Sequence, residues 1–296
     1  MIAGLLLLSV ALTRGAADTG SIRDIPVAAG EVLRTTSTGS GEPLVLVPGL
    51  FGSAYGYRSI VALLVEQGYR TIVIEPLGTG WSSYPSKADY SLTAQADRIA
   101  AAMDSLGLRH VLVVAHAVGT SMALRLAFRH PERVRGLVSI EGGPDESAAT
   151  PGLRKAMRFA GLLKLFVGQG TIRRKVRQGM IANSGDTTWV TPEVVQGYVK
   201  GPGRHMGTTI DAFHRMARSH EPEQLADHLT EIRAPIWLLV GAAPHETAVG
   251  DDEIALLRHR VARFRVDSVR GSGQYIHEEQ PAAVVRAVRA LDAAAR

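Results

Sequence analysis

The stretch VLVVAHAVGTSMALRLA, residues 111–127, has the composition of an apolar strand that turns sharply into a helix. A turn of this kind can hold a reactive side chain at its tip, as in a nucleophile elbow with the frame G-x-S-x-G. Here the frame reads AHAVG (115–119), so the methyl group of Ala117 stands where a serine hydroxyl would attack. The pattern predicts an elbow, and the residue at its tip excludes serine chemistry at that position.

Two ionisable residues near this turn could move a proton without a nucleophile. His116 precedes Ala117, and Glu141 lies at the end of a later apolar run, VRGLVSIEG (134–142). A histidine or a carboxylate beside a bound carbonyl is a candidate general acid or base. A structural alternative stays open for both residues, in which His116 packs the turn and Glu141 is a solvated carboxylate at a strand end.

Apolar runs alternate with amphipathic helical patterns along most of the chain. Runs that favour strands cover residues 43–49, 69–80, 110–116, 134–142, 234–241 and 264–271. Patterns that favour helices cover residues 57–68, 91–107, 121–131 and 281–295. This alternation predicts an α/β fold with a mostly parallel, doubly wound sheet and helices on both faces.

Residues 145–232 interrupt the alternation, because no run in them has the pattern of a strand. They hold a basic helical segment, RRKVRQ (173–178), and two shorter helical segments that Thr191 and Thr208 would cap. A helical block inserted between the strands of a parallel sheet predicts a lid over the carboxyl edge of that sheet. We therefore expect a core of residues 18–144 and 233–296 with a helical cap of residues 145–232.

Composition narrows the classes of function. The 296 residues carry a net charge of +5 and include no cysteine, which excludes disulfides, thiolate catalysis and cysteine-based metal sites. No zinc-finger spacing occurs, and no basic run is interleaved with aromatic residues, so we expect no nucleic-acid partner. We also expect no cofactor and no metal. The basic cap segment is either a solvated face or a contact for a membrane surface or an anionic ligand.

An apolar run covers residues 2–12 near the start of the chain. It is too short to span a bilayer, and it has the length of the apolar part of a signal peptide. Residues 1–17 are therefore predicted to be a signal peptide, with export to the periplasm or the medium. No Lys or Arg precedes the run, so an uncleaved anchor or a cytoplasmic protein is the alternative.

From Glu42 onward the chain resembles the α/β-hydrolase family, in the branch with a helical cap. The matching segments follow the family order: VPGLFGS (47–53), EPLGTGWSS (75–83), the elbow and next strand (115–142), APIWLLVGAAP (234–244) and GSGQYIHEEQPAAV (271–284). In this family a serine attacks, a histidine takes its proton and an acid orients the histidine. The resemblance implies that the pocket lies under the cap.

The resemblance also implies that all three triad positions are substituted. Ala117 stands at the serine position, Gln274 at the histidine position and Pro244 at the acid position, with His245 or Glu246 within reach of the last. Because triad members act as a unit, we do not expect hydrolysis by this triad. Other hydroxyls nearby, Thr120 and Ser121, belong to the helix rather than the tip, and His277 is expected to cap the last helix.

The family's oxyanion hole is made of backbone amides, which need no particular side chain. The resemblance places these donors at Leu50 or Phe51 and at Val118. We therefore expect a non-hydrolytic protein, either a binder of a small apolar carbonyl or carboxylate compound or a pseudoenzyme with a scaffolding role. Two alternatives stay open: an enzyme that uses Glu141 or His116 for non-covalent acid–base chemistry, and an esterase or epoxide hydrolase with a displaced triad.

Overall fold

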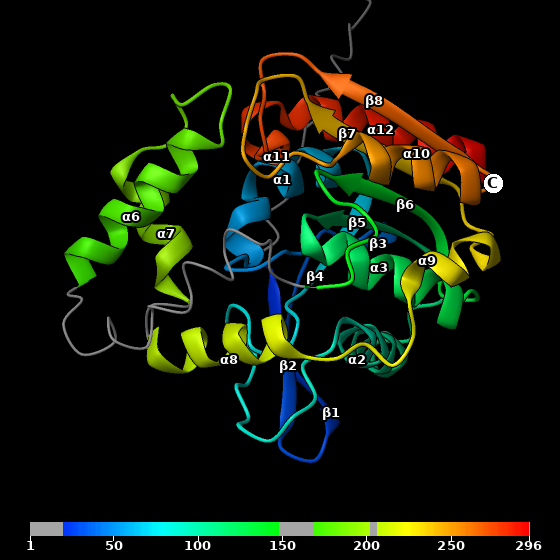
Figure 1. Ribbon diagram of the computed structural model, residues 1–296, viewed down its shortest axis with the longest axis horizontal. Helices are drawn as coiled ribbons and strands as arrows, with labels where there is room; N and C mark the ends of the chain where they lie inside the picture. The colour runs from blue at the N-terminus through cyan, green and yellow to red at the C-terminus, as the bar shows by residue number, and fades with distance from the viewer. Residues whose placement is uncertain (1–19, 148–168, 202–205, 296) are drawn as a thin grey trace, which may run out of the picture.

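The computed structural model describes residues 20–147, 169–201 and 206–295 (Figure 1). One sheet of eight strands runs through the molecule in the order β1-β2-β4-β3-β5-β6-β7-β8. Strands β3 to β8 pair in parallel, whereas β1 and β2 join the sheet antiparallel. The strand bounds are β1 Ser21–Ala28, β2 Glu31–Thr38, β3 Glu42–Val47, β4 Tyr69–Ile74, β5 Val111–His116, β6 Val134–Ile140, β7 Ile236–Gly241 and β8 Phe264–Val269.

Helices cover both faces of this sheet, and a further group lies between β6 and β7 in the chain. The core helices are η1 Ala54–Tyr57, α1 Arg58–Glu66, α2 Leu92–Ser105, α3 Val118–Arg129, α10 Asp251–Arg260, α11 Ile276–Glu279 and α12 Pro281–Ala295. The helices of the inserted group are α6 Gln169–Ala182, α7 Pro192–Lys200, α8 Met206–Arg218, α9 Leu225–His228 and η3 Leu229–Glu231.

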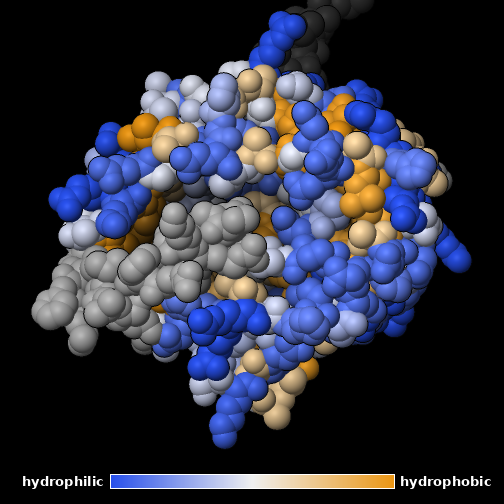
Figure 2. Space-filling view, viewed as in Figure 1, coloured by the Kyte–Doolittle hydropathy of each residue, from blue (hydrophilic) through white to orange (hydrophobic). Residues whose placement is uncertain are grey.

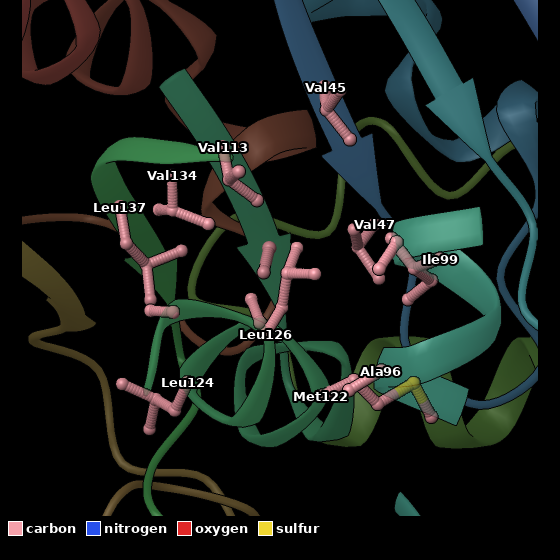
Figure 3. Close-up of a cluster of buried hydrophobic side chains, with 14 of the residues drawn as sticks. Val45, Val47, Ala96, Ile99, Val113, Met122, Leu124, Leu126, Val134 and Leu137 are labelled. Carbon is pink, nitrogen blue, oxygen red and sulfur yellow. The ribbon is translucent and has the colours of Figure 1, made fainter. Parts of the chain in front are cut away.

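Alternate residues of the central strands feed two separate cores. On β3, Val45 and Val47 join the core that α2 and α3 cover, and the intervening Leu44 and Leu46 join the core under α1 and α12. Figure 3 shows the first core, where Met122 of α3 lies beside Ala96 of α2 and Ile99 of α2 points towards Val47 of β3. Burial on both faces explains the continuous apolar runs. The predicted fold class, a doubly wound sheet with a helical cap, is confirmed.

The inserted helices cover the loops that follow β3 and β4, which is the carboxyl edge of the sheet. Close backbone approaches fix them there: a Cβ on Gly56 of η1 would lie 3.1 Å from the Tyr198 hydroxyl of α7, and a Cβ on Gly78 would lie 2.8 Å from Ala212 of α8. The described part of the cap, 169–201 and 206–232, is helical. Residues 148–168 and the predicted signal peptide lie outside the described residues.

Three local expectations differ from the structure. The β1–β2 hairpin lies before the first predicted strand run, at 43–49; its outer strand is exposed, and Gly30, with φ of +74°, makes its turn. Helix α3 begins at Val118 rather than at residue 121, since the helix starts directly after the elbow residue. Thr191 caps α7 as expected, whereas Thr208 lies inside α8. Within the described residues, no helix has both the length and the apolarity needed to cross a membrane.

Two distant segments of the cap are tied to one buried arginine on α3. The side chain of Arg125 is fully buried, and its guanidinium lies 2.6 Å from Glu146, near the start of the cap, and 3.4 Å from Glu221, between α8 and α9. Glu221 also accepts hydrogen bonds from the backbone amides of Leu92 and Thr93 at the start of α2. Arg125 therefore neutralises the carboxylate of Glu221, which is buried in the folded protein.

Removal of this guanidinium should be costly. We expect Arg125→Met to lower the free energy of unfolding by about 3–5 kcal/mol, because Glu221 is left buried without its counter-charge. The matched control is Arg129→Met, one turn later on α3, whose half-exposed ion pairs with Asp97 and Glu223 predict a loss of no more than about 1 kcal/mol. Urea unfolding followed by circular dichroism measures both, and equal losses would contradict the buried-charge argument.

Candidate active site

The elbow exists as a strained turn between β5 and α3. Ala117 has φ of +49° and ψ of −129°, a conformation that a residue with a side chain rarely adopts. Its amide donates to the Ile140 carbonyl of β6 at 2.9 Å, and its carbonyl accepts from the Thr120 amide at 2.8 Å. The β5–β6 ladder and the first turn of α3 therefore hold the turn from both sides, without help from a serine.

Two glycines allow α3 to start against the end of β3. A Cβ on Gly119 would lie 2.7 Å from the Val47 carbonyl oxygen and 2.8 Å from that of Pro48, and one on Gly49 would lie 2.9 Å from the His116 carbonyl oxygen. This close approach sets the loop with Leu50 and Phe51 beside the first amide of α3, on Val118. A first-turn amide has no acceptor within its own helix, so it is free to point at a ligand.

The close approach at Gly119 predicts a large effect of one methyl group. We expect Gly119→Ala to destabilise the protein by about 2–3 kcal/mol, because the new Cβ meets two backbone carbonyls that cannot move aside. The matched control is Gly179→Ala in α6, where a new Cβ would meet no atom within 4 Å. There the gain in helix propensity should stabilise by up to about 1 kcal/mol. Thermal unfolding compares the two, and an unchanged midpoint for Gly119→Ala would contradict this packing.

Gln274, which we expected at the histidine position, is held through its backbone from two directions. Its amide donates to the Asn183 carbonyl of the cap at 2.8 Å, and its carbonyl lies 3.1 Å from His116 Nε2. Since a carbonyl can only accept, His116 must carry its proton on Nε2. Gln274, His116 and Ala117 are each only partly buried, so the structure brings the elbow and the substituted histidine position together at an accessible surface.

The two histidines of this region are both neutral rings packed face to edge. Their ring centroids lie 4.5 Å apart, and burial lowers the pKa of His116 to about 4. His277 is buried on α11 against Tyr57, and burial together with His116 holds the pKa of its imidazole well below the usual range. Its Nδ1 has no hydrogen-bond partner among the described residues. His277 therefore lies beneath the elbow and does not cap the last helix, which is α12.

Glu141 is turned away from solvent at the end of β6. Its side chain is fully buried, its carboxylate accepts hydrogen bonds from the amides of Gly241 and Val249, and His245 Nε2 lies 3.3 Å away without the alignment of a hydrogen bond. Burial raises the pKa of this carboxyl group. Pro244, at the acid position, is exposed, and His245 donates from Nδ1 to the Ala243 carbonyl. The Glu141–His245 pair thus joins the ends of β6 and β7.

The turn after β4 contains a buried carboxyl group that the sequence had not singled out. Glu75 accepts hydrogen bonds from the amides of Ala54 and Trp81, and a Cβ on Gly80 would run into its carboxylate, which is why Gly80 suits that position. Burial is the main influence on this group and raises the pKa of Glu75 to about 7, against the two amide bonds and Arg34, which lower it. Its position directly after an apolar run was the signal available in the sequence.

Glu75 predicts a pH dependence of stability with a definite sign. Its folded pKa of about 7 lies above the unfolded value, so the folded state binds the proton more tightly and loses stability as pH rises from about 4.5 to about 7. Glu75→Gln removes this titration but keeps an acceptor for only one of the two amides, since Ala54 donates to Oε1 and Trp81 to Oε2. This loss does not depend on pH, so we expect the stability of the variant relative to the wild type to rise by about 1–3 kcal/mol between about pH 5 and about pH 8.

Urea unfolding at several pH values measures this gain. The matched control is Glu66→Gln, an exposed carboxylate on α1, whose stability should run parallel to that of the wild type. A difference between wild type and Glu75→Gln that does not change with pH would contradict a buried, titrating Glu75.

Aromatic rings flank the elbow on two sides. The Phe51 ring, 44% exposed, meets Phe213 of α8 with centroids 4.0 Å apart. On the other side Tyr275 lies 6.0 Å from His116 and 5.1 Å from Trp189 of the cap, centroid to centroid. Figure 2 shows the surface hollowed between the core and the helices α6 and α7. The site therefore offers apolar walls around a small set of backbone amides.

Two carboxylates next to His277 fasten the cap to this wall. Glu279 accepts from the cap amides of Gly185 and Asp186 and from the core amide of Gly273. Glu278 accepts from the Tyr198 hydroxyl of α7 at 2.8 Å. In the sequence HEEQP (277–281), we expected a role only for the histidine. The two carboxylates, Glu278 and Glu279, make the contacts with the cap. Within the part of the chain that is described, no group of acidic or histidine side chains could hold a metal ion.

Comparison with known proteins agrees with this architecture. Residues 42–186 match the family model described as alpha/beta hydrolase fold. The chain is 31% identical over 131 residues to a 2-hydroxymuconate semialdehyde hydrolase of Pseudomonas sp. (strain CF600), a match that covers 43% of this chain and 46% of that protein. It is 32% identical over 160 residues to a haloalkane dehalogenase of Mycolicibacterium paratuberculosis, covering 50% and 53%. The chain thus spans about half the length of these relatives.

Solved structures extend the likeness to almost the whole chain. An epoxide hydrolase, CorEH, superposes with a TM-score of 0.78 at 19% identity, over 94% of this chain and all of that one. At this level of identity the likeness concerns the fold. It includes the cap as well as the sheet, because the matched residues extend far beyond the core.

Proposed function

Because the chain has the α/β-hydrolase fold, we propose that it is a non-hydrolytic protein that binds a small apolar ligand through a carbonyl or carboxylate group. One observation carries the proposal: the elbow keeps its strained backbone while Ala117 stands at its tip. A methyl group cannot attack a carbonyl, and the Gln274 amide cannot act as a general base. What the site retains is binding geometry.

The retained geometry suits an oxygen atom with negative charge. Backbone amides of Leu50, Phe51 and Val118 need only the turn that Gly49 and Gly119 permit. The N-terminus of α3 adds the positive end of a helix dipole at the same place. The walls are apolar and aromatic, so the rest of the ligand should be apolar, and partly exposed His116 and Ala117 support an open site rather than one filled by side chains.

A second candidate is an enzyme that acts by proton transfer. His116 is the ionisable group nearest the elbow tip, and its neutral ring carries the proton on Nε2. Burial lowers its pKa to about 4, so it is a weak base at neutral pH. The names of the relatives, a hydrolase and a dehalogenase, also favour catalysis over binding alone. Glu141 contributes less to this candidate, since its carboxylate is buried and engaged by backbone amides.

The binding proposal predicts which ligands and which substitutions matter. Octanoate and 2-octanone should raise the unfolding temperature, whereas octyltrimethylammonium should not, because backbone N–H groups repel a cation. Ala117→Leu, which fills the space above the elbow, should weaken octanoate binding at least about tenfold. Ala117→Ser, nearly equal in size to the wild type, should change it by less than about threefold. Isothermal titration calorimetry measures the affinities.

Chemical labelling and turnover separate the alternatives. A fluorophosphonate probe should leave the wild type unlabelled, and clear labelling would mean a displaced nucleophile and a true hydrolase. Turnover of p-nitrophenyl octanoate that is lost in His116→Gln, with octanoate affinity intact, would favour the proton-transfer enzyme. Octanoate affinity that does not respond to Ala117→Leu would place the ligand elsewhere and contradict the proposal.

A further inference from the structure

Helix α6 carries a dense row of cations on the outer side of the cap. Arg173, Arg174, Lys175 and Arg177 are all exposed, and none of them has an ion pair or hydrogen bond to another described residue. The apolar side of the same helix is already used, since Met180 is buried with Val190 and Val195 of the cap. Among the described residues, the cationic face of α6 makes no such contact.

This row belongs to a wider separation of charge along the chain. Residues 148–220 contain twelve Lys and Arg but only three Asp and Glu, a formal charge of +9, whereas the whole chain carries +5. The remainder is therefore net negative. Four cations within five residues repel one another and lower helix stability. The described residues of the chain supply no carboxylate to these four side chains, and a negatively charged surface would offset their repulsion.

We propose that the cationic face of α6 docks the cap on an anionic lipid surface. The face has the exposed cations that anionic headgroups attract, at about 1 kcal/mol, or about fivefold in affinity, for each Lys or Arg. It has no exposed aromatic residue for stacking with nucleic-acid bases. Figure 2 shows hydrophilic residues over α6 at the left edge of the view, beside the hollow that separates it from the core.

The position of α6 connects such a surface with the elbow. The helix ends at Ala182, and the next residue, Asn183, accepts the Gln274 amide. Asp186 and Gly185 then bind Glu279. A cap seated on a bilayer would therefore place the mouth of the site next to the phase in which apolar ligands dissolve. The docking itself depends on charge alone and does not require the proposed ligand.

The test is cosedimentation of the full chain with vesicles of phosphatidylcholine, with and without about one quarter phosphatidylserine, at about 0.1 M and about 0.5 M NaCl. We expect binding to the anionic vesicles only, and its loss at the higher salt. Arg174→Gln/Arg177→Gln should weaken this binding about 25-fold. The matched control, Arg286→Gln/Arg289→Gln, removes the same charge from exposed positions on α12 and should stay within about twofold of the wild type.

Three results would overturn the proposal. Equal losses of vesicle binding in the two double variants would mean that the net charge of the protein, not the α6 face, causes the binding. Equal binding to neutral and anionic vesicles would exclude headgroup charge. Binding to duplex DNA or poly-aspartate that is tighter than binding to anionic vesicles, and weakened by the α6 variant, would assign the face to a different polyanion.

Discussion

The close approach between the start of α3 and the end of β3 is the constraint on which the site depends. Gly119 permits it, because any Cβ there would collide with the carbonyl oxygens of Val47 and Pro48. The residue before Leu50, Gly49, lies close to Ala117, since a Cβ on Gly49 would be 3.2 Å from Ala117 Cβ, and Ala117 has a positive φ of +49°. The arrangement of the amides is therefore a property of the backbone, not of any reactive side chain.

This separation of backbone from side chain explains how the elbow persists without serine. The strain at Ala117 is balanced by the β5–β6 ladder and by the first turn of α3, neither of which involves the residue at the tip. The methyl group of Ala117 offers no covalent chemistry, and the backbone of the turn does not depend on it. The geometry of a turn of this kind can therefore be maintained without a nucleophile at its tip.

The sequence predicted the sheet, the elbow and the cap because each has a strong pattern: apolar runs buried on both faces, the AHAVG frame, and a long segment without strands. It could not predict the β1–β2 hairpin, whose exposed outer strand has little apolar periodicity. Nor could it place His277 under the elbow or pair Glu141 with His245, since these contacts join residues that only the folded chain brings together. Short-range patterns specify elements, whereas buried polar contacts depend on tertiary geometry.

Buried polar contacts also decide how the cap relates to the site. Arg125 holds two distant segments of the cap through Glu146 and Glu221, while Glu279 fastens residues 185–186 to the loop of Gln274. The backbone of Gln274 is thus fixed by the cap on one side and by His116 on the other. Among the described residues these contacts come from its backbone, so they do not depend on the type of side chain at this position. The loop of Gln274 therefore joins the cap to the elbow.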